Sequence, residues 1–372
     1  MTDSTTKYYQ LSQKIKLWGR ELGFQHVGIS DIDLSEQTPG FLSWLEKGYH
    51  GEMQFMAEHG AKRYRPDELL PGTISIVSVR MDYLPPQAEF AKTLADEKRA
   101  YISRYALGRD YHKVMRNKLK KLGQKIGQEL DLADMSFRPF VDSAPVLERP
   151  IAEKAGIGWI GKHSLVLSET AGSWFFLGEL FLPLPLPADR PVEDKCGKCV
   201  ACMTICPTQA IVEPYVVDSR KCISYLTIEQ KGSIPEQFRP LMGNRIYGCD
   251  DCQLICPWNR FAEVTTEADF SPREKLHPVK LLELWQWSEQ EFLDNTQGNP
   301  IRRIGYTSWM RNIAVALGNA PMSLEIVEQL REKLNIINVL VDEHIEWALK
   351  QQEAKAEQLS IDSRKLKRLI KA

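Results

Sequence analysis

Apolar positions in the first half of the chain alternate between helical and strand spacing. Leu11, Ile15, Trp18 and Leu22 recur every three or four residues, which predicts an amphipathic helix over residues 9–22. The same criteria predict further helices over residues 41–47, 111–130 and 146–155. Short apolar runs predict strands at residues 24–29, 73–79, 137–141 and 174–182. The pattern therefore predicts an α/β region that ends in a proline-spaced linker over residues 183–187.

After residue 257 the pattern becomes helical. Trp309, Ile313 and Leu317 share one helix face, and two further apolar stripes follow. Helices joined by short turns are typical of one or two α-solenoid repeats. No apolar run approaches the ~18 residues of a membrane span, and the beginning of the sequence lacks an apolar export segment. We therefore expect no membrane association and a cytoplasmic protein.

Composition and charge narrow the function classes. The chain has 372 residues, 43% of them hydrophobic and 26% charged, with a formal net charge of −1. This balance argues against a histone-like nucleic-acid binder but allows local basic patches. A basic run lies on the helix expected at residues 111–130, and a solvated helix face is favoured there over an RNA-contacting face. No G-x-G-x-x-G or P-loop sequence supports a dinucleotide fold or an ATPase.

All eight cysteines lie between residues 196 and 256. The first run is C-x2-C-x2-C-x3-C-P, and a second run repeats it without its first cysteine, which leaves Cys222 between them. In two-cluster bacterial ferredoxins this spacing binds two [4Fe–4S] clusters, and the fourth cysteine of each run binds the other cluster. The predicted ligands are Cys196, Cys199, Cys202 and Cys256 for one cluster, and Cys206, Cys222, Cys249 and Cys252 for the other.

Two alternatives remain for these cysteines. Zinc ribbons also use C-x2-C pairs, but zinc explains neither the crowded third and fourth cysteines nor the two Cys-Pro endings. A disulfide framework does not suit a chain of this size without an export signal. Eight thiols kept for metal imply a reducing compartment.

Several segments resemble the epoxyqueuosine reductase family, corrinoid-dependent enzymes that complete queuosine at the tRNA wobble position. The similarity covers nearly the whole chain, including the position of Cys222. The matching segments are ISRYALGRDYH at residues 102–112, FVDSAPVLER at 140–149, GWIGKH at 158–163, CISYLTIE at 222–229 and RRIGY at 302–306.

The resemblance implies an α+β multidomain fold. Its expected parts are a nitroreductase-like cobalamin-binding domain over residues 1–187, a two-cluster bacterial ferredoxin module over 188–265 and a HEAT-like helical tRNA-binding domain over 266–372. The implied reaction is the reduction of epoxyqueuosine to queuosine, the last step of queuosine biosynthesis. Electrons would pass through the clusters to cobalamin.

Asp142 is the candidate proton donor, because it matches the family's donor in the FVDSAP segment. Opening an epoxide produces an alkoxide, and a positioned acid accelerates such a step by roughly 10²–10⁴-fold. The residue spacing alone favours a different role. Asp and Ser before a proline are typical helix N-terminal capping residues.

The resemblance also places a set of residues on or near cobalamin. His163 by itself is more typical of a structural histidine than of a ligand. The cobalamin-facing candidates are Arg65, Tyr105, Asp142, Lys162, His163, Val166, Ser168, Ser224 and Thr227.

The expected macromolecular partner is a tRNA that presents an epoxyqueuosine anticodon loop. Arg302, Arg303 and Arg311 are the candidate phosphate contacts, and the basic tail after Asp362 is either a further contact or a frayed surface helix. A flavodoxin or ferredoxin is the expected electron donor, and a monomer is expected. The competing functions are a small-molecule corrinoid reductase, similar to reductive dehalogenases, and a non-catalytic ferredoxin-type electron carrier.

Overall fold

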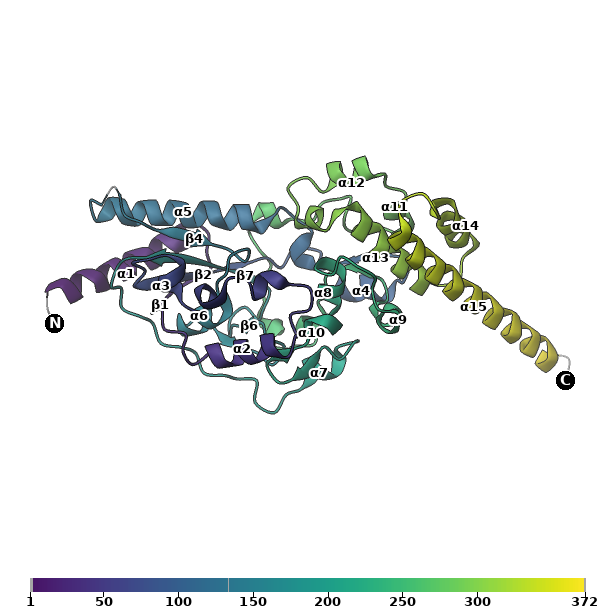
Figure 1. The fold of residues 1–372 in the computed structure, drawn as a ribbon, viewed down its shortest axis with the longest axis horizontal. Helices are drawn as coiled ribbons and strands as arrows, with labels where there is room; N and C mark the ends of the chain where they lie inside the picture. The colour runs from purple at the N-terminus through teal and green to yellow at the C-terminus, as the bar shows by residue number, and fades with distance from the viewer. Residues whose placement is uncertain (1–2, 133, 371–372) are drawn as a thin grey trace. The chain divides into compact units, whose positions relative to one another are not determined.

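The computed structural model describes residues 3–132 and 134–370 (Figure 1). The chain divides into two compact units. Unit 1 contains the chain up to Pro86 together with Gly108–Arg220 and Asp250–Ser271. Unit 2 contains Gln87–Leu107, Lys221–Cys249 and the chain from Pro272 onward. Each unit is thus assembled from three separate segments. The division into domains at residues 187 and 265 stays a prediction.

Unit 1 is built on a four-stranded antiparallel sheet in the order β1-β2-β7-β4. β2 and β7 are paired along their whole length, from Ser75 opposite Leu182 to Asp82 opposite Phe175. The four strands are β1 (His26–Ser30), β2 (Ser75–Asp82), β4 (Arg138–Phe140) and β7 (Phe175–Leu182). The helices of this unit are α1 (Asp3–Glu21), α2 (Thr38–Glu46), α3 (Pro66–Leu69), α5 (Tyr111–Glu129), α6 (Glu148–Lys154), α7 (Ala201–Ile205) and α10 (Asp251–Leu254).

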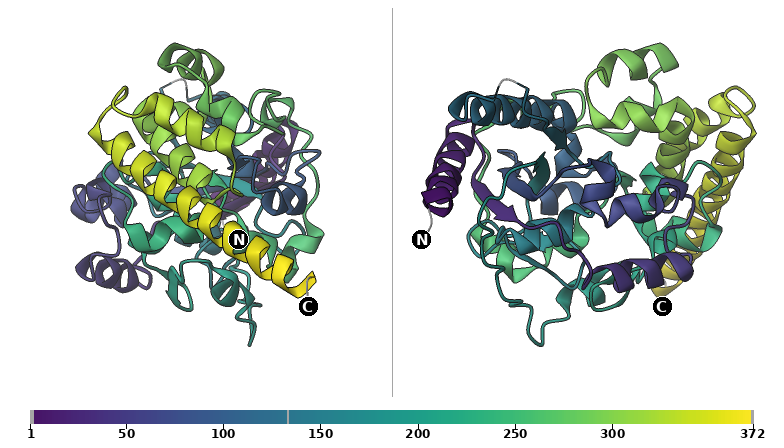
Figure 2. Two further views of the ribbon diagram at one scale, coloured as in Figure 1. Left: turned by 90° about the vertical axis from the view of Figure 1, so that its right-hand side faces the viewer. Right: turned by 60° about the vertical axis from the view of Figure 1, so that its left-hand side comes forward.

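Helices α5 and α6 pack against β7. Gly178 on β7 lies against Met115 and Leu119 of α5, where a larger side chain would collide with both. Because successive strand residues point to opposite faces, Glu179 points away from α5. Figure 2 shows α1 beside α5.

The cysteine-rich part of unit 1 and the segment 159–167 contain only short regular elements. Two antiparallel pairs, β5 (Trp159–Ile160) with β6 (Val166–Leu167) and β8 (Ile211–Glu213) with β9 (Val216–Val217), accompany the contacting helices α7 and α10.

Unit 2 is mainly helical around one apolar core. Trp285, Phe292 and Trp309 are fully buried in this core. A short parallel pair, β3 (Tyr101–Ile102) with β10 (Arg245–Tyr247), joins two distant segments of the unit. Helix α15 packs against α13 (Figure 2). The helices are α4 (Phe90–Ala95), α8 (Ile223–Ile228), α9 (Arg239–Met242), α11 (Leu281–Trp285), α12 (Glu289–Asn295), α13 (Gly305–Asn319), α14 (Leu324–Lys333) and α15 (Val339–Ile370).

The sequence predictions for the longer elements are confirmed, with boundaries shifted by a few residues. α1 begins at Asp3 instead of residue 9, and β2 extends to Asp82 instead of residue 79. The helical character of the C-terminal part is confirmed as well. In the described part of the chain, no helix combines the length and apolarity that crossing a membrane requires.

Candidate functional site

Asp142 lies in the turn between β4 and α6 and has a left-handed backbone, with φ of 55°. Aspartate is one of the few residues other than glycine that adopts this conformation at modest cost. The Asp142 side chain is 60% exposed. Its backbone N–H donates to Oε1 of Glu148 at 2.5 Å. The expected helix cap is absent, because Leu147 occupies the N-cap position of α6 and makes no side-chain cap bond.

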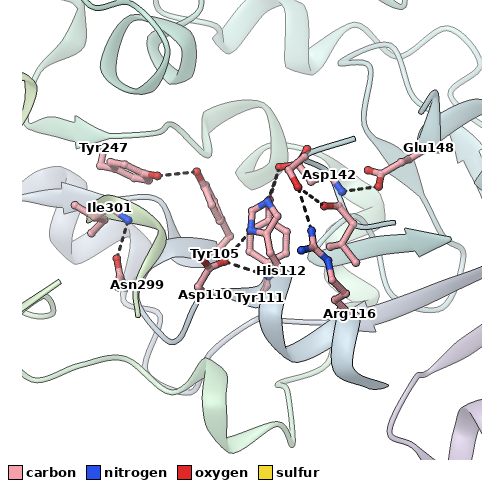
Figure 3. A network of polar contacts seen from close by, with 12 residues as sticks. Tyr105, Asp110, Tyr111, His112, Arg116, Asp142, Glu148, Tyr247, Asn299 and Ile301 are labelled. Atoms are coloured by element: carbon pink, nitrogen blue, oxygen red, sulfur yellow. Dashed lines mark hydrogen bonds and ion pairs between the residues drawn. The ribbon is translucent and has the colours of Figure 1, made fainter. Parts of the chain in front are cut away.

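Two side chains from the first turn of α5 converge on the Asp142 carboxyl group (Figure 3). The Tyr111 hydroxyl donates to Oδ2 at 2.6 Å, and Nε2 of His112 lies 3.2 Å from the same oxygen. Nδ1 of His112 lies 2.7 Å from Oδ1 of Asp110, the N-cap residue of α5. His112 therefore bridges two carboxyl groups and is 4% exposed. This arrangement is suited to holding and passing a proton.

Aromatic packing determines the orientation of Tyr111. Its ring stacks on Phe176 of β7 at 3.9 Å with an interplanar angle of 4°. Phe176 in turn meets the edge of Phe270 at 5.2 Å. The hydroxyl that reaches Asp142 is consequently positioned by the apolar core of unit 1.

Two more carboxyl groups lie behind the Asp142 turn. Glu179 on β7 is fully buried, and its side chain contacts Glu148 at the start of α6. Burial and the neighbouring carboxylates raise the pKa of Glu148 to about 7 and raise the pKa of Glu179 well above its usual range. Like charges in a buried site disfavour ionisation of both groups.

The structure brings four of the predicted cluster ligands together in unit 1. Burial raises the pKa of the Cys256 thiol, and the nearby thiols of Cys196, Cys202 and Cys199 raise it further. Four grouped thiols are unfavourable as thiolates unless a cation offsets their charge, and iron supplies that charge in a cluster. These four residues form the first predicted ligand set. All eight cysteines are described, and none forms a disulfide.

The second predicted ligand set is divided between the units. Cys206 and Cys252 belong to unit 1, whereas Cys222 and Cys249 belong to unit 2. The backbone N–H of Ala210 donates to the Cys206 sulfur at 3.2 Å. Within the described residues, no three His, Cys, Asp or Glu side chains are arranged around a single metal ion.

Lys162 binds the cysteine loop. Its ammonium group donates to the carbonyl oxygens of Gly197 at 2.6 Å and Cys199 at 2.9 Å. Burial raises the pKa of Cys196, and the backbone N–H of Lys162 acts in the opposite direction. Lys162 therefore supports the first thiol group, and its side-chain nitrogen is already committed to these carbonyls.

Three other predicted cobalamin-facing residues are buried and contribute to packing or hydrogen bonds within the protein. Ser168 is buried and accepts a hydrogen bond from Arg80. The Thr227 hydroxyl donates to the Ile223 carbonyl and accepts from the Gly248 N–H. Val166 is buried in β6. Ser168 and Thr227 thus already form hydrogen bonds within the protein, and Val166 has no hydrogen-bonding group in its side chain.

The remaining candidates are more varied. Burial lowers the pKa of His163 to about 4, so His163 is neutral near pH 7, and its buried Nε2 has no partner in the described structure. Arg65 is largely exposed and forms ion pairs with Asp67 and Glu68. In unit 2, Ser224 is half-buried, and the Tyr105 hydroxyl lies 3.4 Å from that of Tyr247.

The predicted RNA-contacting role of Arg311 is wrong. Its side chain is fully buried and donates to the carbonyl oxygens of Leu226, Gln230 and Gly232 at 2.7–2.9 Å. The guanidinium therefore holds together two segments of unit 2. Arg302 and Arg303 are exposed on the turn before α13, as an RNA contact requires. The side chains of the predicted basic tail, Arg364, Lys365, Lys367, Arg368 and Lys371, lie outside the described residues.

Sequence reasoning missed four residues of the Asp142 site. Tyr111 and His112 lie in one matching segment and Glu148 in another, yet none was assigned a role. Glu179 is a lone acidic residue in the otherwise apolar run of residues 175–182, and this unusual placement was the available signal.

Comparison with known proteins identifies the class first. Residues 195–259 match the family model described as a 4Fe-4S double cluster binding domain. Residues 63–143 match the model described as epoxyqueuosine reductase QueG. The chain is therefore an iron–sulfur redox protein that binds two clusters, and the zinc reading of the cysteines is set aside.

A near full-length relative identifies the family. The epoxyqueuosine reductase of Escherichia coli strain K12 is 65% identical over 343 residues, which cover 92% of this chain and 90% of the relative. This chain belongs to the epoxyqueuosine reductase family.

Two solved structures share the fold at 28% identity. One is an epoxyqueuosine reductase with an epoxyqueuosine-modified tRNA-Tyr stem loop; its TM-score is 0.85, and the match covers 95% of this chain and 93% of that one. The other is the Bacillus subtilis epoxyqueuosine reductase with an aspartate catalytic loop swung out of the active site. Its TM-score is 0.84, and the match covers 95% of this chain and 94% of the other.

Proposed function

We propose that this chain reduces epoxyqueuosine to queuosine at the wobble position of tRNA. The near full-length identity of 65% to an epoxyqueuosine reductase is the observation that carries this proposal. The reaction converts the epoxide to an alkene and releases its oxygen as water. It consumes two electrons and two protons, so the enzyme needs a redox relay and a proton donor at one site.

Asp142 is the proposed proton donor to the epoxide oxygen. Its exposed carboxyl group can reach a substrate, while Tyr111 and His112 hold Oδ2 from the protein side. Because His112 also contacts Asp110, it can return a proton to Asp142 after the first transfer without leaving its position. The Bacillus subtilis relative has an aspartate catalytic loop, swung out of the active site in that structure, and this supports the assignment of the Asp142 turn as the catalytic loop.

Two [4Fe–4S] clusters supply one electron at a time. The thiols grouped around Cys256 fit the first cluster in number and chemistry, and Lys162 holds their loop. Cobalamin is the second redox group implied by the family, and when bound it supplies a strongly reducing cobalt centre. Arg65 and the backbone of the turn at residues 161–163 are the groups of unit 1 proposed to hold it. Tyr105, Ser224 and Thr227 stay predictions for unit 2, with Thr227 limited to packing.

The proposed substrate is the anticodon stem loop, as in the related complex with a modified tRNA-Tyr stem loop. Exposed Arg302 and Arg303 are the proposed phosphate contacts. For the fold, the proposal includes a HEAT-like arrangement of α11–α15 and a nitroreductase-like core in unit 1. It also includes a cytoplasmic location, a monomeric state and a flavodoxin or ferredoxin as the electron donor. Family membership favours this function over the small-molecule reductase and the simple electron carrier.

An anaerobic turnover assay tests the proposal. Reconstituted protein, cobalamin and a low-potential reductant are mixed with tRNA that carries epoxyqueuosine, and the digested nucleosides are analysed by mass spectrometry. We expect the loss of one oxygen mass only when cobalamin is present. Intact clusters with no conversion would favour a small-molecule substrate, and failure to bind cobalamin would favour the electron carrier.

The second ligand set has its own test. Cys222→Ser should remove one cluster and leave the other, so that iron content falls from about eight to about four atoms per chain. Iron analysis and electron paramagnetic resonance measure this loss. An unchanged iron content would contradict the assignment of Cys222.

A further inference from the structure

Glu179 is a buried acidic side chain to which no described residue donates a hydrogen bond. It is 0% exposed, and neither carboxyl oxygen accepts a hydrogen bond in the described structure. It lies at the centre of the sheet, opposite Ser78 of β2 and Phe140 of β4. A fully buried carboxylate in this position is strongly unfavourable unless it carries a proton.

Among the described residues, the carboxyl group nearest in effect to that of Glu179 belongs to Glu148, on the helix α6 that packs against β7. Glu148 is half-buried and Glu179 is 0% exposed, so ionisation is less unfavourable at Glu148 than at Glu179. A protonated Glu179 donates to an ionised Glu148, and the remaining lone pairs of Glu148 accept from other donors. One such donor is already present, the Asp142 backbone N–H at 2.5 Å.

We propose that Glu148 and Glu179 form a proton-sharing carboxyl pair that holds the Asp142 turn in its left-handed conformation and so positions the proton donor. The inference rests on the proposed function, because it assigns Asp142 as that donor. Glu148 and Glu179 are positioning residues, since they act on the substrate only through Asp142. Three carboxyl groups are thereby connected from the sheet interior to the exposed turn.

The charged groups around the pair come from several elements. Asp142 in the turn opposes ionisation of both glutamates, whereas His112 of α5 favours ionisation of Glu148. Arg63, from the short helix at Gly60–Arg63, and Arg149 of α6 are electrostatically coupled to Glu148. With the pKa of Glu148 at about 7 and that of Glu179 further raised, the pair keeps its last proton at neutral and mildly alkaline pH. When that proton is lost, two adjacent anions repel, and the more exposed Glu148 releases the Asp142 N–H.

Two substitutions at Glu179 distinguish the effect of its hydrogen-bond donor from the effect of its side-chain size. Glu179→Gln keeps a donor that is not lost at alkaline pH, and Glu179→Leu has no donor. We expect Glu179→Leu to lower kcat by roughly tenfold with an unchanged KM for tRNA, which corresponds to the loss of one buried hydrogen bond. Glu179→Gln should keep kcat closer to that of the wild type and should remove the alkaline decline that the pair causes. Glu58→Gln, at an exposed position of the same unit, is the matched control.

Amide hydrogen exchange of residues 140–148 in the cluster-loaded protein provides a readout that needs no turnover. Exchange should accelerate in Glu179→Leu and Glu148→Ala. It should remain close to wild type in Glu179→Gln, whose amide can still donate to Glu148, and in Glu148→Gln, whose oxygen can still accept from the Asp142 N–H. Glu148 is half-buried, so its variants still report if Glu179→Leu does not fold. Equal exchange and equal pH profiles in the Leu and Gln variants would overturn the proposal. If the wild type does not convert epoxyqueuosine, the proposed function fails, while the exchange result still decides whether the pair holds the turn.

Discussion

Arg311 in unit 2 and Glu179 in unit 1 are both fully buried charged side chains, but their hydrogen bonding differs. In unit 2, the Arg311 guanidinium donates to three backbone carbonyls, and Asn312 next to it donates to the carbonyls of Thr227 and Ile246. In unit 1, neither carboxyl oxygen of Glu179 accepts a hydrogen bond from any described residue, and its neighbour is another carboxyl group, that of Glu148. A buried network in which every polar group has a hydrogen-bond partner stabilises one fold. A buried network in which a carboxyl group lacks a donor can take up or release a proton. The buried charge of Arg311 therefore serves the fold, whereas the buried carboxyl group of Glu179 is suited to proton exchange.

The largest expected effect follows from Asp142→Asn. The amide keeps the left-handed backbone but has no acidic proton, so kcat should fall by about 10²–10⁴-fold. Cluster absorbance and tRNA affinity should remain at wild-type values. Single-turnover assays measure the change. Asp131→Asn is the control, because Asp131 is exposed and has the same φ of 55°. Equal losses in both variants would contradict the catalytic assignment.

Arg311→Met tests the structural side of the comparison. It leaves three buried carbonyl oxygens without their donor, so the free energy of unfolding should decrease by about 3 kcal/mol. Urea denaturation followed by circular dichroism measures this loss. Arg302→Met, at an exposed position, should change stability by less than about 0.5 kcal/mol. A stable Arg311→Met protein with weakened tRNA binding would restore the contact role that the structure contradicts.

Acid should weaken unit 2 through His344. This side chain is fully buried, donates from Nδ1 to the Leu340 carbonyl and accepts the Ile234 N–H at Nε2, so it is neutral in the folded state. Burial lowers the pKa of His344 to about 4, below the unfolded value of about 6.5. The unfolded state therefore binds the proton more readily, and stability is lost as pH falls from about 6.5 towards 4. The loss between pH 7 and pH 5 should reach roughly 2 kcal/mol.

Urea unfolding at pH 7 and pH 5 measures the acid effect. His344→Gln, which retains an acceptor for the Ile234 N–H, should reduce the pH dependence. His163, whose pKa burial also lowers to about 4, contributes a separate share and stays unchanged in this variant. An identical pH dependence in the variant and the wild type would show that His344 is not the group responsible.

The smallest expected effect concerns the exposed arginines. Replacing Arg302 and Arg303 by alanine together should reduce the slope of log affinity against log salt for tRNA by about 1.5, because each lost phosphate contact removes about 0.7–0.9. Fluorescence anisotropy at several salt concentrations measures the slope. The double substitution should leave stability almost unchanged. An unchanged slope would remove these residues from the proposed interface.

The sequence predicted elements that depend on local periodicity. The α5 helix and the β7 strand follow from apolar spacing over many residues, and both were placed within one or two residues. The two-residue strands of β3 and β5 were missed, because so short a segment has no period. β3 and β10 pair over more than 140 residues of sequence, a contact that no local pattern records.

The candidate functional site was, like the fold, predictable only where the residues follow a local sequence pattern. Cysteine spacing predicted the thiol group around Cys256, because the ligands of one cluster are close in sequence or belong to a repeated motif. The partners of Asp142 come from α5, the start of α6 and β7, and only the fold brings them together. Arg311 was misread for the same reason. Its carbonyl partners lie about 80 residues away in the sequence, so the local pattern predicted an exposed arginine beside an apolar helix face.

The left-handed backbone of Asp142 also limits how this position can change during evolution. Asparagine and glycine are the residues that replace aspartate at a φ of 55° with little strain, and neither has an acidic proton to give. Glutamate would keep the acid, but its longer side chain brings a conformational cost and a displaced carboxyl group. Asparagine and glycine would therefore abolish the proposed proton donation, and glutamate, which preserves a carboxylic acid, would disturb the turn. Conformation and chemistry independently select the same amino acid, so few single-step changes at residue 142 leave both intact.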